Sequence, residues 1–347
     1  MTKAWAALGL LAISGLSLGQ RISVAGTRFQ VDGKRIWISG TNTPWKNWND
    51  FGNSFDEQWW RNQFHSLAAA HVNATRVWIS CSGQNDSPGI SANGRVLPPT
   101  PRFWKDLDSL FEIARSERVY LMTALISFDH TKPGNPRADS WRLMYADPKN
   151  RQSFVDSYVV PLVRRYGGNP YFWAIDVGNE LDWTFDNQHM PMGDTVDLIA
   201  RVAEAVHRNS RVLVCEGMGT AAKYISAKYQ GTILSDASLS ARKPGAHVDF
   251  YNVHYYDWVR RWFGSPFEQS PSDMGLSGKP CIVGETSSKG SSGQTILQNW
   301  QNAFRLGWDG VMAWTSNGVD GNGSLDDFLE GPAWFFRAHP GLVHPSG

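Results

Sequence analysis

Eight short apolar segments recur along the chain, separated by stretches long enough to form helices. They are rich in Val, Ile, Tyr and Trp, and most are nearly continuous apolar runs, which is typical of strands buried on both faces of a parallel sheet. The segments are residues 35–41, 74–80, 119–126, 172–177, 212–215, 248–254, 281–284 and 310–314.

The stretches between these strands show the spacing of amphipathic helices. Apolar residues recur every three or four positions over residues 103–114 and again over residues 196–206. Strand and helix alternate along most of the chain, which predicts an α/β protein with a single (β/α)8 (TIM) barrel. A doubly wound open sheet is the alternative. Residues 24–33, with Asp32-Gly33 as the turn, are expected to form a hairpin at the bottom of the barrel.

The N-terminus has the pattern of a secretory signal peptide. Lys3 precedes an apolar stretch, residues 4–18, and Ser17-Leu18-Gly19 places small residues at a cleavage site. We expect residues 1–19 to be a signal peptide, residues 20–347 to form the barrel domain, and the protein to be secreted or periplasmic. The apolar stretch is short for a membrane span, although a retained anchor is the alternative.

Composition adds two constraints. Lys and Arg number 33 and Asp and Glu number 32, and this balance argues against a nucleic-acid groove. The chain contains 17 Trp, an excess of flat aromatic faces that suggests a sugar ligand, with a Trp-rich core as the alternative. The tryptophans expected at or near loops around a cleft are Trp45, Trp48, Trp59, Trp60, Trp141, Trp183, Trp258 and Trp262.

Other familiar motifs are absent or weak. The three cysteines, Cys81, Cys215 and Cys281, form no CxxC, and two lie in apolar runs where small buried thiols are expected; a disulfide is the alternative. No HExxH, P-loop or GxSxG motif occurs. Residues 217–222 match the dinucleotide fingerprint GxGxxA, but after the fifth predicted strand rather than the first.

Carboxylates follow two of the predicted strands, at the end of a barrel where active sites are found. Glu180 follows the fourth strand and Glu285 the seventh, 105 residues later. Strands four and seven face one another across the barrel mouth, so these side chains can flank one bond of a substrate. Hydrolysis of a glycosidic bond needs such a pair, one to protonate the leaving oxygen and one to stabilise or attack the sugar carbon. For each glutamate alone, a helix N-cap or a surface ion pair is the alternative.

The ordered set of residues at the strand ends resembles glycoside hydrolase family 5, in clan A. The residues that show the resemblance, over nearly the whole chain after residue 19, are Arg76, Asn179, Glu180, His254, Tyr256, Glu285 and Trp314. The resemblance implies a retaining β-glycosidase on a (β/α)8 barrel, with no metal or cofactor.

The resemblance also implies roles for the polar residues. Glu180 corresponds to the acid/base, and burial is expected to raise its pKa toward neutral. Glu285 corresponds to the nucleophile, which Arg76 would keep ionised and Tyr256 would contact through a hydrogen bond. His254 and Tyr256 differ by two positions and so share one face of their strand.

Further residues are expected to bind the sugar. Asn179 would bind its 2-hydroxyl, and Trp314 would form the floor of the cleavage subsite. His130 is displaced from the position after strand three where many family members carry a His, so it either binds substrate or is an ordinary loop residue. The tryptophans that directly follow strands one, four and six are the best candidates for sugar stacking: Trp45, Trp183 and Trp258.

The substrate class is suggested by one short motif. Arg76-Val77-Trp78 resembles the β-mannanase members of the family more than its cellulase members. We therefore expect hydrolysis of β-1,4-linked mannan, with an endo-β-1,4-glucanase as the alternative. An inactive barrel that only binds polysaccharide is the alternative of another class. We expect a monomer that binds a β-linked polysaccharide or oligosaccharide and no nucleic acid, and that leaves the membrane after signal cleavage.

Overall fold

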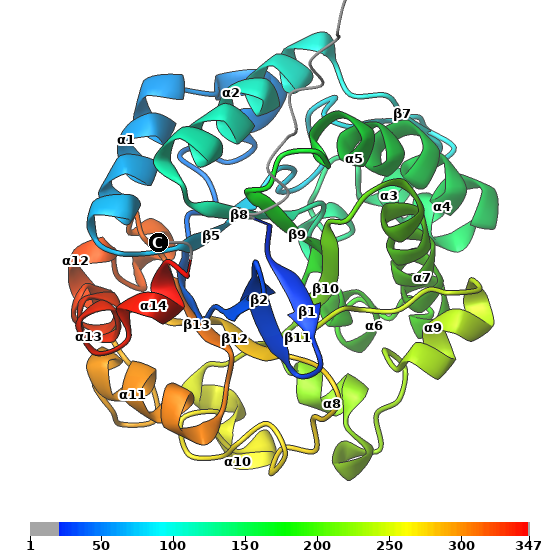
Figure 1. Ribbon diagram of the computed structural model, residues 1–347. Coiled ribbons are helices and arrows are strands. Elements are labelled where there is room, and N and C mark those ends of the chain that lie inside the picture. Colours follow the sequence, from blue (N-terminus) through cyan, green and yellow to red (C-terminus); the bar gives the residue numbers. More distant parts are fainter. Residues whose placement is uncertain (1–20, 346–347) are drawn as a thin grey trace, which may run out of the picture.

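A computed structural model describes residues 21–345, so the predicted signal peptide lies outside the described residues. Within that range, eight parallel strands close into a barrel in the order β10-β11-β12-β13-β4-β5-β8-β9, with helices around it (Figure 1). The strands are β4 (Ile38–Asn42), β5 (Ala74–Trp78), β8 (Tyr120–Ala124), β9 (Phe172–Asn179), β10 (Leu213–Met218), β11 (Tyr251–His254), β12 (Cys281–Ser287) and β13 (Gly310–Trp314). The predicted (β/α)8 barrel is confirmed, and the open-sheet alternative is wrong.

Both helices expected from the apolar spacing are present. α2 (Pro101–Glu117) begins where the Thr100 side chain accepts a hydrogen bond from the backbone N–H of Phe103, and it ends at Arg118 in the left-handed conformation. α7 (Met192–Asn209) buries its apolar face against the barrel. The other helices are α1 (Glu57–Ala69), α3 (Ala138–Ala146), α4 (Pro148–Phe154), α5 (Val160–Tyr166), α6 (Asp182–Asp186), α8 (Ala221–Ile225), α9 (Asp236–Arg242), α10 (Arg260–Phe263), α11 (Ile296–Leu306), α12 (Leu325–Phe328), α13 (Glu330–Ala338) and α14 (Pro340–Val343).

The N-terminal segment forms a three-stranded sheet rather than the predicted simple hairpin. β1 (Ser23–Ala25), β2 (Arg28–Val31) and β3 (Lys34–Arg35) pair antiparallel. Asp32 and Gly33 form the second of its two turns, both with positive φ (52° and 76°), as a tight hairpin turn requires. In Figure 1 the dark blue β1 and β2 lie across the centre of the barrel. The sheet therefore closes the bottom of the barrel, as expected.

The barrel interior is packed with side chains. Phe29 of β2 is fully buried, and its ring centroid lies 5.6 Å from that of Trp173 and 5.2 Å from that of Phe250. Apolar side chains from the strands fill the layer above, as in other barrels of this size. The interior of the barrel is therefore closed at this end, and a cleft that opens onto the barrel axis can form only at the opposite end.

Three further features complete the architecture. Cys81, Cys215 and Cys281 are buried free thiols, so the disulfide alternative is wrong. In the long connection after β5, the short strands β6 (Gly89–Ile90) and β7 (Val96–Leu97) pair antiparallel. A helix that crosses a membrane must be both long and apolar. Among residues 21–345, no helix is long and apolar enough to do so.

Candidate active site

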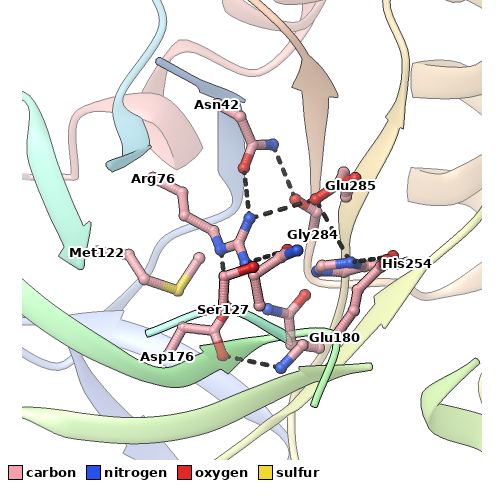
Figure 2. A network of polar contacts seen from close by, with 12 residues as sticks. Asn42, Arg76, Met122, Ser127, Asp176, Glu180, His254, Gly284 and Glu285 are labelled. Atoms are coloured by element: carbon pink, nitrogen blue, oxygen red, sulfur yellow. Dashed lines mark hydrogen bonds and ion pairs between the residues drawn. The ribbon is translucent and has the colours of Figure 1, made fainter. Parts of the chain in front are cut away.

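Glu180 and Glu285 meet at the carboxyl ends of the strands. Glu180 follows β9 directly, with the positive φ of 49° that is uncommon for a residue with a Cβ and is frequent at functional sites. Glu285 lies in β12, and His254 ends β11. One carboxylate oxygen of each glutamate and one ring nitrogen of His254 all lie within 4.8 Å of one another. Figure 2 shows the three side chains pointing toward one another. The predicted convergence of the two carboxylates is thus present.

The environment of Glu180 favours its protonated form. Oε1 lies 3.1 Å from Nδ1 of His254, and Oε2 accepts a hydrogen bond of 2.9 Å from the indole of Trp183. Burial raises the pKa of Glu180 to about 7, against the opposing effects of the Arg76 charge and the Trp183 hydrogen bond. At neutral pH this carboxyl group can therefore both donate and accept a proton.

The environment of Glu285 is different. Its Oε2 lies 3.2 Å from the guanidinium of Arg76, and its Oε1 accepts a hydrogen bond of 2.8 Å from the hydroxyl of Tyr256. Burial raises the pKa of Glu285, and His254, Arg76 and the Tyr256 hydroxyl oppose that rise. Direct contact with a guanidinium and a hydroxyl donor stabilises the ionised form, so the two glutamates are suited to different tasks.

His254 lies between the two glutamates. Its Nδ1 is 3.1 Å from Glu180 and 3.4 Å from Glu285, while Nε2 has no hydrogen-bond partner among the described residues. Burial lowers the pKa of His254 to about 4, so the ring is neutral at pH 7. Its single proton belongs on Nδ1, where both acceptors lie, and it can be donated to one carboxylate at a time.

Arg76 organises the floor of the site. Its side chain is fully buried and donates to Asp176 (2.8 Å), Asn42 (3.1 Å), Asn179 (2.9 Å) and Glu285 (3.2 Å). Asp176 and Asn42 were not predicted as site residues. The available signal for Asp176 was a carboxylate inside the apolar run of residues 172–177, because such a charge needs a buried partner.

The site opens into a cleft rich in tryptophan. A cavity of about 330 Å³ lies over the two glutamates. Its lining residues are Trp45, Trp48, Trp78, Phe128, Asp129, Lys132, Asn179, Glu180, Glu285, Trp314 and Asp320. Trp45, Trp78 and Trp314 pack with ring centroids 4.9–5.9 Å apart. Three of the residues expected to bind sugar, Trp45, Asn179 and Trp314, line this cavity together with the two glutamates.

A second cavity, of about 170 Å³, lies beside Trp183. Trp183, which bonds Glu180, is one of its walls, and the half-exposed Trp258 is another, with ring centroids 6.1 Å apart. Trp262 lies 6.3 Å beyond Trp258 and is also half-exposed. These three indoles form a row that leads away from the carboxylates.

Other predicted cleft residues are placed elsewhere. His130 is fully buried and lines neither cavity; its Nε2 bonds the Ser80 hydroxyl at 3.0 Å, and its ring lies 4.6 Å from that of Trp141. His130 is thus buried within the loop after β8, which favours the second of its two expected roles, an ordinary loop residue, over contact with substrate. Trp60 and Trp141 are likewise core residues with no exposed surface, and Trp59 lies beside Trp60 on α1.

The glycines of the apparent dinucleotide fingerprint have a packing role. Gly217 lies in β10, and a Cβ there would sit 2.5 Å from Nε2 of His254 and 2.8 Å from Asp176. In β12, a Cβ on Gly284 would sit 1.7 Å from the side chain of Asn252. Both positions need glycine because buried polar side chains approach the backbone. Gly217, the first glycine of the apparent fingerprint, is thus packed against His254 and Asp176.

Buried carboxylates surround Glu180. Asp182 accepts a hydrogen bond of 3.1 Å from the backbone of Gly219, and Glu216 accepts one of 3.1 Å from Gly178. Burial raises the pKa of Asp182 to about 8, and the nearby charge of Glu180 adds to the rise. The charges of two other carboxylates, Asp129 and Asp176, add to the effect of burial in raising the pKa of Glu180.

Comparison with known proteins agrees with this geometry, although no family model matches the chain. It is 22% identical over 358 residues to the mannan endo-1,4-β-mannosidase of Cryptopygus antarcticus, covering 94% of this chain and 91% of that protein. It is 24% identical over 356 residues to the enzyme of the same name from Mytilus edulis, covering 92% and 94%.

Solved structures share the fold. The X-ray structure of the β-mannanase from the blue mussel Mytilus edulis matches with a TM-score of 0.82 at 21% identity, covering 94% of this chain and 99% of that one. The glycoside hydrolase family 5 mannosidase from Rhizomucor miehei matches with a TM-score of 0.56 at 14% identity, covering 86% of each chain. The predicted resemblance to glycoside hydrolase family 5 is confirmed.

Proposed function

We propose that this protein is a retaining β-mannanase that hydrolyses β-1,4 bonds of mannan. The observation that carries the proposal is the approach of Glu180 and Glu285 oxygens to within 4.8 Å. Retaining glycosidases hold their carboxyl groups about 5–5.5 Å apart, whereas inverting enzymes leave about 6.5–9.5 Å for a water molecule. The names of the curated relatives support mannan as the substrate.

The first chemical step uses both glutamates. Glu180, protonated near neutral pH, gives its proton to the glycosidic oxygen while the ionised Glu285 attacks the anomeric carbon. The carbon–oxygen bond breaks, the leaving chain departs with the proton, and a glycosyl ester forms on Glu285. Arg76 and Tyr256 hold the attacking carboxylate in one orientation.

The second step releases the sugar. Glu180, now ionised, removes a proton from a water molecule as the water attacks the anomeric carbon. The ester bond breaks and Glu285 returns as a carboxylate, with the starting anomeric configuration restored. Asn179, held by Arg76, would bind the 2-hydroxyl, and Trp314 would lie under the reacting sugar.

The remaining parts of the proposal concern the whole chain. Residues 1–19 act as a signal peptide for secretion, and residues 20–347 form one monomeric catalytic domain. The indoles of Trp45, Trp183 and Trp258 stack on sugars along the cleft.

The test is the release of reducing sugar from mannan, carboxymethyl-cellulose and xylan. The wild type is expected to cleave mannan fastest, and Glu180→Ala and Glu285→Ala to lose about a thousandfold or more. Glu112→Ala, on the exposed face of α2, is the control and should keep full activity. Faster cleavage of carboxymethyl-cellulose would identify a glucanase, and binding without cleavage would identify an inactive polysaccharide-binding barrel.

Two further measurements separate the roles. The first measurement uses an aryl β-mannobioside with a good leaving group, for which the first step needs little protonation of the leaving oxygen. On this substrate Glu180→Ala should still form the glycosyl ester, whereas Glu285→Ala should not. Proton NMR of the first product should show the β-anomer. An α-anomer as the initial product would overturn the retaining mechanism.

A further inference from the structure

A second cluster of metal-ligating side chains lies at the other end of the barrel. His207 is near the end of α7, and His247 and Asp249 lie in the segment that enters β11. Asp249 precedes His254 by five residues along this segment, a separation of roughly 16 Å in extended chain. One ring nitrogen of each histidine and one oxygen of Asp249 all lie within 4.8 Å of one another. The cluster takes no part in the proposed hydrolysis.

The side chains are held so that their possible ligand atoms converge. The two imidazole rings stack with centroids 4.1 Å apart and planes 19° apart. Asp249 Oδ2 accepts hydrogen bonds from His207 Nε2 (2.9 Å) and from the backbone of Val214 (2.7 Å). Both sides of the cluster are thus fixed by strands or helices of the barrel.

His247 is oriented as a ligand histidine usually is. Its Nδ1 lies 2.9 Å from the carbonyl oxygen of Gly245, and a bond to a backbone carbonyl through one ring nitrogen leaves the other with a lone pair. That other nitrogen, Nε2, lies 3.6 Å from Asp249 Oδ1, beyond hydrogen-bond distance. A lone pair and a carboxylate that face each other repel unless a cation or a proton lies between them.

We propose that His207, His247 and Asp249 bind one divalent transition-metal ion, with Zn²⁺ as the preferred ion. Two imidazoles and one carboxylate form a ligand set that suits zinc, and the partly exposed His247 leaves room for water as a fourth ligand. Lys279, whose charge acts on His247, is already paired with Asp236 at 2.6 Å. Bound metal would tie the end of α7 to the segment before β11 and so stabilise the barrel base.

The test is a calorimetric titration in which Zn²⁺ alone is added to the full chain. The protein is prepared without a histidine tag and is first stripped of metal with EDTA. We expect one ion per chain, and at least about a tenfold loss of affinity in His247→Gln. Zinc should raise the Tm of the wild type and leave that of His247→Gln unchanged. His65→Gln is the matched control, because His65 is more exposed and lies on α1, outside the cluster.

Each other outcome overturns the proposal. Equal zinc affinity in His247→Gln and the wild type would place the ion elsewhere, and no measurable binding by the wild type would show that the cluster is only a hydrogen-bonded contact. Because His247 is partly exposed, its replacement should leave the circular dichroism spectrum unchanged. Asp249→Asn gives a second variant, in which loss of the carboxylate charge should also weaken binding.

Discussion

Arg76 and Asp176 form an ion pair of 2.8 Å in which neither side chain has exposed surface. Asp176 also accepts a hydrogen bond of 2.9 Å from the backbone of Gly217, so the pair joins β5, β9 and β10. Burial alone would lower the pKa of Arg76, but the charges of Asp176 and Glu285 raise it overall. The guanidinium is thus held charged beneath Glu285.

Replacement of Asp176 by Asn should damage both stability and activity. Removal of one partner leaves the Arg76 charge buried with less compensation, which typically costs about 3–5 kcal/mol in the free energy of unfolding. Urea unfolding of Asp176→Asn should show a loss of this size. Asp86→Asn, which removes a largely exposed ion pair with Arg137, is the control and should change the free energy little. Similar losses in the two variants would contradict the importance of the buried pair.

The Tyr256 hydroxyl should affect the lower limit of the pH range in which the enzyme is active, through its hydrogen bond to Glu285. Tyr256→Phe removes a hydrogen bond to the ionised form of Glu285, so the pKa of Glu285 should rise and the acidic limb of kcat/KM should move to higher pH. A hydrogen bond to a charged group is worth about 1.5–3 kcal/mol, which corresponds to a loss of about 10- to 100-fold in kcat.

The neighbouring tyrosine provides the control for this variant. Tyr255 points away from the carboxylates and bonds Ser292 and Asp257. Tyr255→Phe should therefore leave the acidic limb in place. A shift of the same size in both variants would refute the role assigned to Tyr256.

Glu180 should set the upper limit of the pH range. The proposed acid must be protonated in the free enzyme, and its pKa is about 7, so kcat/KM should fall as the pH rises through 7. Trp183→Phe removes a hydrogen bond that favours the ionised form, so the pKa should rise and the alkaline limb should move to higher pH. Tyr256→Phe should leave this limb unchanged. An alkaline limb that does not respond to Trp183→Phe would argue that another group controls it.

The row of indoles beyond Glu180 should matter for long substrates only. Trp258→Ala removes a half-exposed wall of the second cavity, and loss of an apolar contact of this kind costs about 1–2 kcal/mol. KM for mannohexaose should rise about tenfold, while kcat/KM for mannotriose should change little. Leu143→Ala, an exposed apolar side chain of α3, should affect neither substrate. Equal effects on both substrates would mean that Trp258 supports the fold rather than the sugar chain.

Local pattern determined the barrel and the convergence of its two glutamates. Buried parallel strands are continuous apolar runs whatever their neighbours, so their number and order can be followed in the chain. Once the strands are placed, barrel geometry brings all their carboxyl ends to one rim, and Glu180 and Glu285 must meet there. The expectation that Tyr256, two positions after His254, contacts Glu285 agrees with the structure, although β11 ends at His254 and Tyr256 lies just beyond the strand.

Tertiary packing alone decided which side chains contact one another. Asn42 and Asp176 bind Arg76 because three strands from separate parts of the chain bring them to one guanidinium. The ring of His130 is buried against Ser80, which lies 50 positions away in the chain. His207 and Asp249 are 42 positions apart, and only the docking of α7 against the barrel brings them within 2.9 Å. Periodicity records which face of an element is buried, but distances between side chains depend on rotamers and on the close approach of elements, which no local pattern contains.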